Sequence, residues 1–129
     1  MKPRQVLLFS SDHTFDQLVS EALRGTGTIV LIARHVHDAI QIVRDRGREL
    51  DFALMDFSGG CRGMTLLSAL HTCHQELPIL VTTSEDAAHA TVVARANGAR
   101  ACLNKPFPAT TLADAISNLT ASFGRLAAA

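Results

Sequence analysis

Short apolar runs alternate along the chain with longer segments whose apolar residues recur at every third or fourth position. A short apolar run is typical of a buried strand, and the recurrence is typical of an amphipathic helix. The runs lie at residues 5–9, 28–33, 52–55, 78–83 and 101–104. The recurrence predicts five helices. The first begins after residue 12, the next three span about 38–48, 64–75 and 86–97, and the last spans about 109–126.

This alternation of strands and helices is typical of an α/β protein. Right-handed crossovers would make the strands parallel and would place helices on both faces of one doubly wound sheet. We therefore expect a five-stranded parallel sheet flanked by five helices. In such sheets, ligands bind beyond the carboxyl ends of the strands, so the residues at those ends are the ones to examine.

The ends of the predicted helices carry suitable capping residues. Asp12 and Thr14 are both acceptable N-caps for the first helix, and Gln17 would complete a capping box with Thr14. Asp38 is expected to cap the second helix in the same way. Asn97-Gly98 predicts a left-handed stop after the fourth helix.

Composition narrows the class of protein. The chain has 129 residues, 47% of them hydrophobic, and its twelve basic side chains balance twelve acidic ones. Length and composition favour one domain, and the balanced charge argues against a standing affinity for nucleic acid or anionic lipid. Three well-separated cysteines indicate reduced thiols, and no apolar run is long enough for a signal peptide or a membrane span. We therefore expect a cytoplasmic protein.

Polar side chains follow four of the predicted strands at the points where the strands end. A carboxylate, a hydroxyl and an ammonium brought together at one edge are suited to a phosphoryl group. Each residue alone is an ordinary turn or cap residue, and only their joint occurrence points to a site. The residues are Ser10, Ser11 and Asp12, then Asp56, then Thr83 and Ser84, and finally Lys105.

Over about residues 4–122, these motifs resemble the receiver domains of two-component response regulators. The resemblance rests on the segments that end in Asp56, in Thr83-Ser84 and in Lys105-Pro106-Phe107. It implies a flavodoxin-like fold with strand order 2-1-3-4-5, a single domain over 1–129 and a short C-terminal tail at 123–129. It also implies a phosphoacceptor at Asp56, a switch hydroxyl at Thr83, a phosphoryl-contacting lysine at Lys105, and a cis bond before Pro106.

The same resemblance implies the partners. They are a histidine kinase or phosphotransfer protein that supplies the phosphoryl group, and a downstream protein that responds to it. The domain is then a signalling module and not an enzyme, it does not bind nucleic acid itself, and a homodimer is left open.

The end of the first strand departs from the family pattern. Receivers usually place two adjacent acids there to hold Mg²⁺, and this chain has Ser10 and Ser11. Mg²⁺ favours carboxylate oxygens, and serine hydroxyls are neutral. A site made of Asp12, Asp56 and Ser58 (through its carbonyl) should therefore be weak. Two further departures are Cys102, where receivers usually have a Tyr or Phe, and a glycine-rich loop after Asp56 without the usual proline.

Three hypotheses follow. In the first, the chain is an atypical receiver that acts mainly as a protein-interaction module with weakened Mg²⁺-dependent phosphorylation at Asp56. In the second, it is a working phosphoacceptor in which Asp12 supports the metal. In the third, a flavodoxin-like domain binds a small molecule, which is disfavoured because the chain has no Trp or Tyr to stack on a flavin. His71 and His74 have the spacing of a metal clip, but an exposed helix face explains them more simply.

Overall fold

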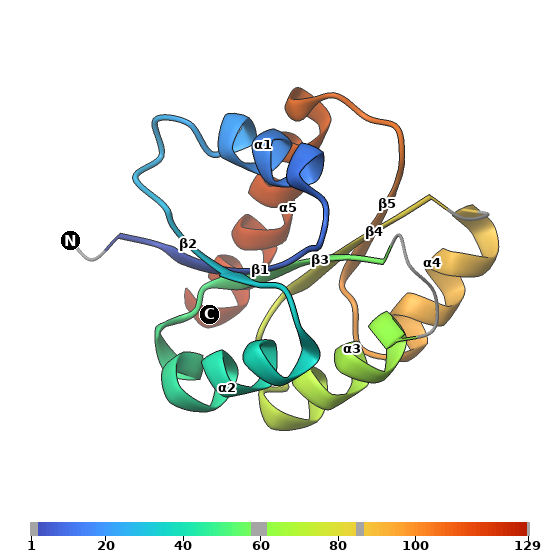
Figure 1. The fold of residues 1–129 in the computed structure, drawn as a ribbon. Coiled ribbons are helices and arrows are strands. Elements are labelled where there is room, and N and C mark those ends of the chain that lie inside the picture. Colours follow the sequence, from blue (N-terminus) through green and yellow to red (C-terminus); the bar gives the residue numbers. More distant parts are fainter. Residues whose placement is uncertain (1–2, 58–61, 85–86, 129) are drawn as a thin grey trace.

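The computed structural model describes residues 3–57, 62–84 and 87–128. Strands and helices alternate through these residues (Figure 1). The strands are β1 (Gln5–Phe9), β2 (Ile29–Ala33), β3 (Phe52–Asp56), β4 (Ile79–Thr83) and β5 (Ala101–Asn104). The helices are α1 (His13–Ala22), α2 (Val36–Arg46), a short 3₁₀ turn η1 (Gly47–Glu49), α3 (Arg62–Cys73), α4 (Ala87–Ala96) and α5 (Ala109–Ala128).

The five strands form one parallel sheet in the order β2-β1-β3-β4-β5, which confirms the predicted fold. Every residue of β3 and β4 is buried, as expected for central parallel strands that are covered on both faces. The edge strand β2 is different, because Ile29 and Ile32 are exposed. Burial is therefore most complete in the central strands β3 and β4, at whose carboxyl ends Asp56 and Thr83 lie.

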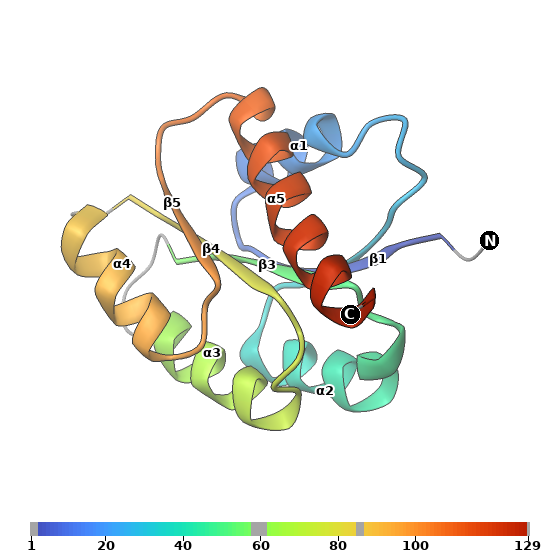
Figure 2. The same ribbon diagram turned by 180° about the vertical axis from the view of Figure 1, so that it is seen from behind.

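Helices cover the sheet on both sides: α1 and α5 lie on one face, and α2, α3 and α4 lie on the other (Figures 1 and 2). Alternate residues of each strand point to opposite faces and divide the core in two. Leu54 and Leu80 belong to the α1/α5 side, and Met55 and Val81 belong to the α2/α3/α4 side. This alternation decides on which face each side chain at the carboxyl edge lies.

The predicted helix ends are partly right. Asp12 is the N-cap of α1, with Oδ1 accepting the backbone N–H of Thr14 at 2.9 Å, so Thr14 is inside the helix and the expected capping box is not formed. The prediction for α2 is wrong, because the helix begins after His35 and Asp38 lies in its first turn. An acid is favourable there through the helix dipole and needs no capping bond. Gly98 has a φ of 111°, which confirms the left-handed stop.

The last helix is longer than expected. It continues to Ala128, so the predicted end at Leu126 is two residues short and the expected tail at 123–129 is helical as far as it is described. The third helix begins and ends two residues earlier than predicted. In the described part of the chain, no helix is both long enough and apolar enough to cross a membrane.

Candidate functional site

Asp56 lies at the carboxyl end of β3, in the middle of the sheet edge. Leu54, two residues earlier, faces the α1/α5 side of the core, so the period of two turns Asp56 toward the same side. Its side chain is only 2% exposed. A carboxylate this deeply buried needs compensating charge and hydrogen bonds, because removing it from water is costly.

Lys105 supplies the compensating charge. Its Nζ lies 2.8 Å from Asp56 Oδ1 and 5.0 Å from the centre of the Phe15 ring. The lysine directly follows β5, and the peptide bond between Lys105 and Pro106 is cis, as the resemblance implied. The short distance indicates a charge-assisted hydrogen bond, which is stronger than a neutral one.

A second donor to the same oxygen comes from Thr82. This residue is completely buried, and its Oγ1 donates to Asp56 Oδ1 at 3.1 Å. The contact follows from the strand register, in which Thr82 is the direct partner of Asp56 on the neighbouring strand. The sequence pattern pointed to Thr83 at this strand end, but two adjacent threonines on a strand face opposite sides of the sheet, and Thr82 is the one on the side of Asp56.

Thr83 is also at the predicted edge, but alternation turns it the other way. It is buried at the end of β4, and Val81 places that side of the strand on the α2/α3/α4 face. Its carbonyl accepts the backbone N–H of Lys105 at 2.8 Å, which ties the lysine's backbone to β4. Asp56, Thr82 and Lys105 therefore form one hydrogen-bonded group, with Thr83 adjoining it along the backbone.

The end of β1 is organised locally. Ser10 is 1% exposed, and its Oγ accepts the backbone N–H of Asp12 at 3.0 Å and lies 3.2 Å from the carbonyl of the same residue. Ser11 is exposed. Asp12 caps α1 with Oδ1, and its Oδ2 lies 3.8 Å from Lys105 Nζ. The serine therefore closes a tight turn at the place where the family usually has an acid.

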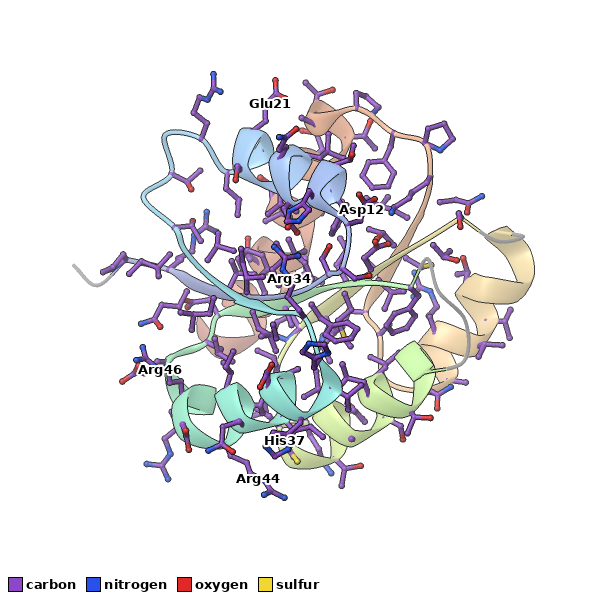
Figure 3. The ribbon with its side chains drawn as sticks, in the orientation of Figure 1. Asp12, Glu21, Arg34, His37, Arg44 and Arg46 are labelled. Atoms are coloured by element: carbon purple, nitrogen blue, oxygen red, sulfur yellow. The ribbon has the colours of Figure 1, made fainter. Side chains whose placement is uncertain are left out.

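Arg34 holds this turn against α1. It follows β2, and its Nη1 donates to the carbonyl of Ser10 at 3.0 Å while Nη2 lies 2.7 Å from Asp16 Oδ2 on α1. Figure 3 shows Arg34 between the end of β2 and α1, below Asp12. No feature of the sequence singled out this arginine. A guanidinium with two acceptors from different elements orients the loop through protein contacts alone.

Among the described residues there is no group of three or more His, Cys, Asp or Glu side chains that could hold a metal ion. Ser10 binds backbone, Asp12 caps a helix and Asp56 contacts Thr82 and Lys105. Ser58, expected to contribute its carbonyl, lies outside the described residues. The arrangement does not fit a site with two adjacent carboxylates.

Other residues that the sequence brought forward have structural roles. His74 Nε2 lies 2.9 Å from the carbonyl of Gly47, and His71 lies so close to Gly98 that a Cβ there would be 2.5 Å from the ring. Both rings are therefore engaged in packing. Cys102 is half-buried on β5 and packs against the core on the α2/α3/α4 side. Gly59 and Gly60 of the loop lie outside the described residues.

A groove opens beside the site. It has a volume of about 400 Å³ and runs between α1 and the segment that follows β5. Phe15, Leu18 and Phe107 contribute its apolar lining, and Asp12 and Lys105 lie at the end next to the carboxylate. The groove joins the candidate site to the surface of α1.

Comparison with known proteins decides the family. The family model of the response regulator receiver domain matches residues 6–117. The chain belongs to this family. No curated protein matches the chain.

Solved receiver structures share its fold. A putative response regulator from Chloroflexus aurantiacus J-10-fl is 28% identical with a TM-score of 0.81, and the match covers 93% of this chain and 99% of that one. A response regulator receiver domain protein from Clostridium thermocellum is 22% identical with a TM-score of 0.82, covering 95% and 98%. The chemotaxis protein CheY4 of Vibrio cholerae is 23% identical with a TM-score of 0.79, covering 92% and 99%. Family membership favours the first two hypotheses over a small-molecule binder.

Proposed function

We propose that this receiver domain is an atypical signalling module, in which Asp56 accepts a phosphoryl group with a reduced contribution from Mg²⁺. One observation carries the proposal. The buried contact of 2.8 Å between Asp56 and Lys105 is kept, whereas Ser10, in place of an acid, bonds to the backbone of Asp12. The nucleophile and its cation are therefore present, and the carboxylates that usually hold the metal are not.

The chemistry at Asp56 is a phosphoryl transfer. A carboxylate oxygen attacks phosphorus and forms an acyl phosphate, while the bond from phosphorus to the donor's leaving atom breaks and that atom keeps the electron pair. Lys105 is placed to neutralise the oxygens of the transferred group. Its ammonium already lies 2.8 Å from Asp56 Oδ1 and has further N–H donors for those oxygens.

The partners follow from the family. Receiver domains interact with histidine kinases or phosphotransfer proteins, and we propose a donor of this kind here, together with a downstream protein. The groove between α1 and the segment after β5 adjoins Asp12 and Lys105 and offers apolar surface beside the reacting group. On this proposal the domain acts in the cytoplasm as an interaction module and not as an enzyme. A homodimer is compatible with it.

A second candidate is a fully working phosphoacceptor whose metal is supported by Asp12. The observation that favours it is the position of Asp12, whose Oδ2 lies 3.8 Å from the ammonium that also contacts Asp56. Turning this oxygen from Lys105 toward a cation would bring a second carboxylate to the site. The change would leave Oδ1 in place as the helix cap.

Acetyl phosphate and intact-mass measurement test the proposal. Protein is incubated with acetyl phosphate over a range of Mg²⁺ concentrations, with Asp56→Asn as the control. We expect an adduct of one phosphoryl group that requires Asp56 and that changes little with Mg²⁺. An adduct that forms only with millimolar Mg²⁺ would favour the second candidate, and no adduct at any concentration would leave only the interaction role.

Backbone amide NMR measures Mg²⁺ binding independently of phosphorylation. Mg²⁺ and then beryllofluoride are titrated into labelled protein, and shifts are followed at Asp56, Thr83 and Lys105. The proposal expects weak, unsaturated shifts with Mg²⁺ alone. Saturation at millimolar Mg²⁺ would overturn the statement that the metal site is weakened.

A further inference from the structure

Thr82 is the first polar residue along β4. Ile79, Leu80 and Val81 precede it and are completely buried, and Thr82 itself has no exposed surface. A buried hydroxyl without a partner is costly, and valine has nearly the same shape without that cost. A threonine at this position is therefore expected to have a hydrogen-bond partner for its hydroxyl.

The contact is the candidate phosphoacceptor. Thr82 Oγ1 donates to Asp56 Oδ1 at 3.1 Å, across the paired strands β4 and β3. Backbone groups in the centre of a sheet are already engaged in the ladder, so a side-chain acceptor is the natural partner for a hydroxyl there. This hydrogen bond joins two buried side chains that are 26 residues apart in the chain.

Two donors thus converge on one carboxylate oxygen. Lys105 reaches Oδ1 from the end of β5, on a long side chain with several rotatable bonds, and Thr82 reaches it from β4 on a short β-branched one. A β-branched side chain has few rotamers, so the hydroxyl keeps its place when the lysine moves. Donors on a single oxygen from two strands restrict rotation of the carboxylate about its Cβ–Cγ bond.

We propose that Thr82 is a positioning residue, whose hydroxyl holds the Asp56 carboxylate in the orientation from which it attacks phosphorus. This inference rests on the phosphoacceptor role proposed above. The role matters most during the reaction, because the flexible Lys105 is then shared with the phosphoryl oxygens while the stiff Thr82 side chain serves the carboxylate alone. Fixing a nucleophile in its attacking orientation raises the rate without changing the affinity for the phosphodonor.

The kinetic test uses Thr82→Val, which keeps the shape and removes the donor, and Thr82→Ser, which keeps the donor. Phosphorylation rates are measured as a function of acetyl phosphate concentration. We expect Val to lower the maximal rate by about five- to tenfold with the half-saturating concentration unchanged, and Ser to restore the rate to within about twofold. A maximal rate in the Val variant equal to that of the wild type would overturn the proposal.

Thr120→Val is the matched control. Thr120 also donates its hydroxyl, to the carbonyl of Ile116 within α5, and it is not part of the site. This variant should keep the wild-type rate. An equal loss of rate in both Val variants would mean that the effect is general destabilisation, and would overturn the positioning role.

A measurement without phosphoryl transfer separates this inference from the proposed function. The effect of Thr82→Val on urea unfolding is measured with Asp56 present and in an Asp56→Ala background, both without metal. We expect Val to change the unfolding equilibrium constant about fivefold more when Asp56 is present, because only then does it break a hydrogen bond to a charged group. Equal effects in both backgrounds would overturn the inference. Coupling in a protein that forms no adduct would show that Thr82 holds the carboxylate, and would overturn the phosphoacceptor role together with the effect of Thr82 on its rate.

Discussion

The two halves of the carboxyl edge differ in which contacts hold their polar side chains. At the ends of β3, β4 and β5, Asp56, Thr82 and Lys105 meet from three strands. At the end of β1, the Ser10 hydroxyl bonds to a residue two positions away in the same turn. The first half depends on long-range side-chain contacts around a buried charge, whereas the second is a short turn around a neutral hydroxyl that Arg34 ties to α1.

This difference shows which half of a receiver site can change at little cost. Asp56 carries a charge in a buried place, so its partners cannot be lost singly without leaving that charge poorly compensated. The acids that hold a metal repel each other without the ion, and neutral serines remove that repulsion. The β1 half therefore keeps its turn with neutral serines, while the β3–β5 half is a linked group.

The largest effect is expected from breaking the linked half at Lys105. Lys105→Met should lower the free energy of unfolding by about 2–3 kcal/mol, because it removes the ammonium partner of the buried Asp56 carboxylate. Urea denaturation measures the loss. In an Asp56→Asn background the same substitution should cost less than about 1 kcal/mol, and equal costs in both backgrounds would show that the pair is not coupled.

Restoring acids to the β1 half should have the next largest effect. Ser10→Asp should cost about 1–2 kcal/mol without metal, because it places a third carboxylate in a buried position near Asp12 and Asp56. Ser11→Asp, at an exposed position, should cost less than about 0.5 kcal/mol. Thermal unfolding with and without Mg²⁺ measures both.

The double variant tests the metal directly. Ser10→Asp combined with Ser11→Asp should strengthen Mg²⁺ binding by at least about tenfold, since it returns two carboxylates beside Asp56. Isothermal titration measures the affinity. An unchanged affinity would mean that the β1 end does not face the metal position.

A smaller effect is expected from loosening the β1 half at Arg34. Arg34→Gln should cost about 1 kcal/mol, because the guanidinium is partly solvated but links Ser10 to Asp16. Amide hydrogen exchange of residues 10–16 should accelerate, and the amides of β4 should not change. Uniform acceleration across the sheet would show that Arg34 does not act on this turn in particular.

The smallest effect separates the two candidate functions at Asp12. Asp12→Asn should change stability by less than about 0.5 kcal/mol, because Asn caps helices as well as Asp does. Asp12→Ala removes the cap and should cost about 1 kcal/mol. If Asp12 supports the metal, Mg²⁺ affinity will fall in the Asn variant, and an unchanged affinity would exclude that role.

Much of the fold was predictable because its signals are local. The apolar runs and the helical recurrences located the strands and helices, mostly to within two residues, and the alternation indicated a parallel sheet. Asp38 was misjudged as a cap because an acid is equally favourable inside the first turn. The pattern alone could not distinguish the two positions.

The sequence by itself determined the class of fold, the residues at the strand ends and the departure at Ser10 and Ser11. Tertiary structure alone decided which hydroxyl meets Asp56 and where Arg34 acts. The reason is that strand register pairs Thr82 with Asp56 across β4 and β3, and the end of β2 brings Arg34 beside α1. These contacts depend on how distant segments are placed side by side, which composition and periodicity along the chain do not record.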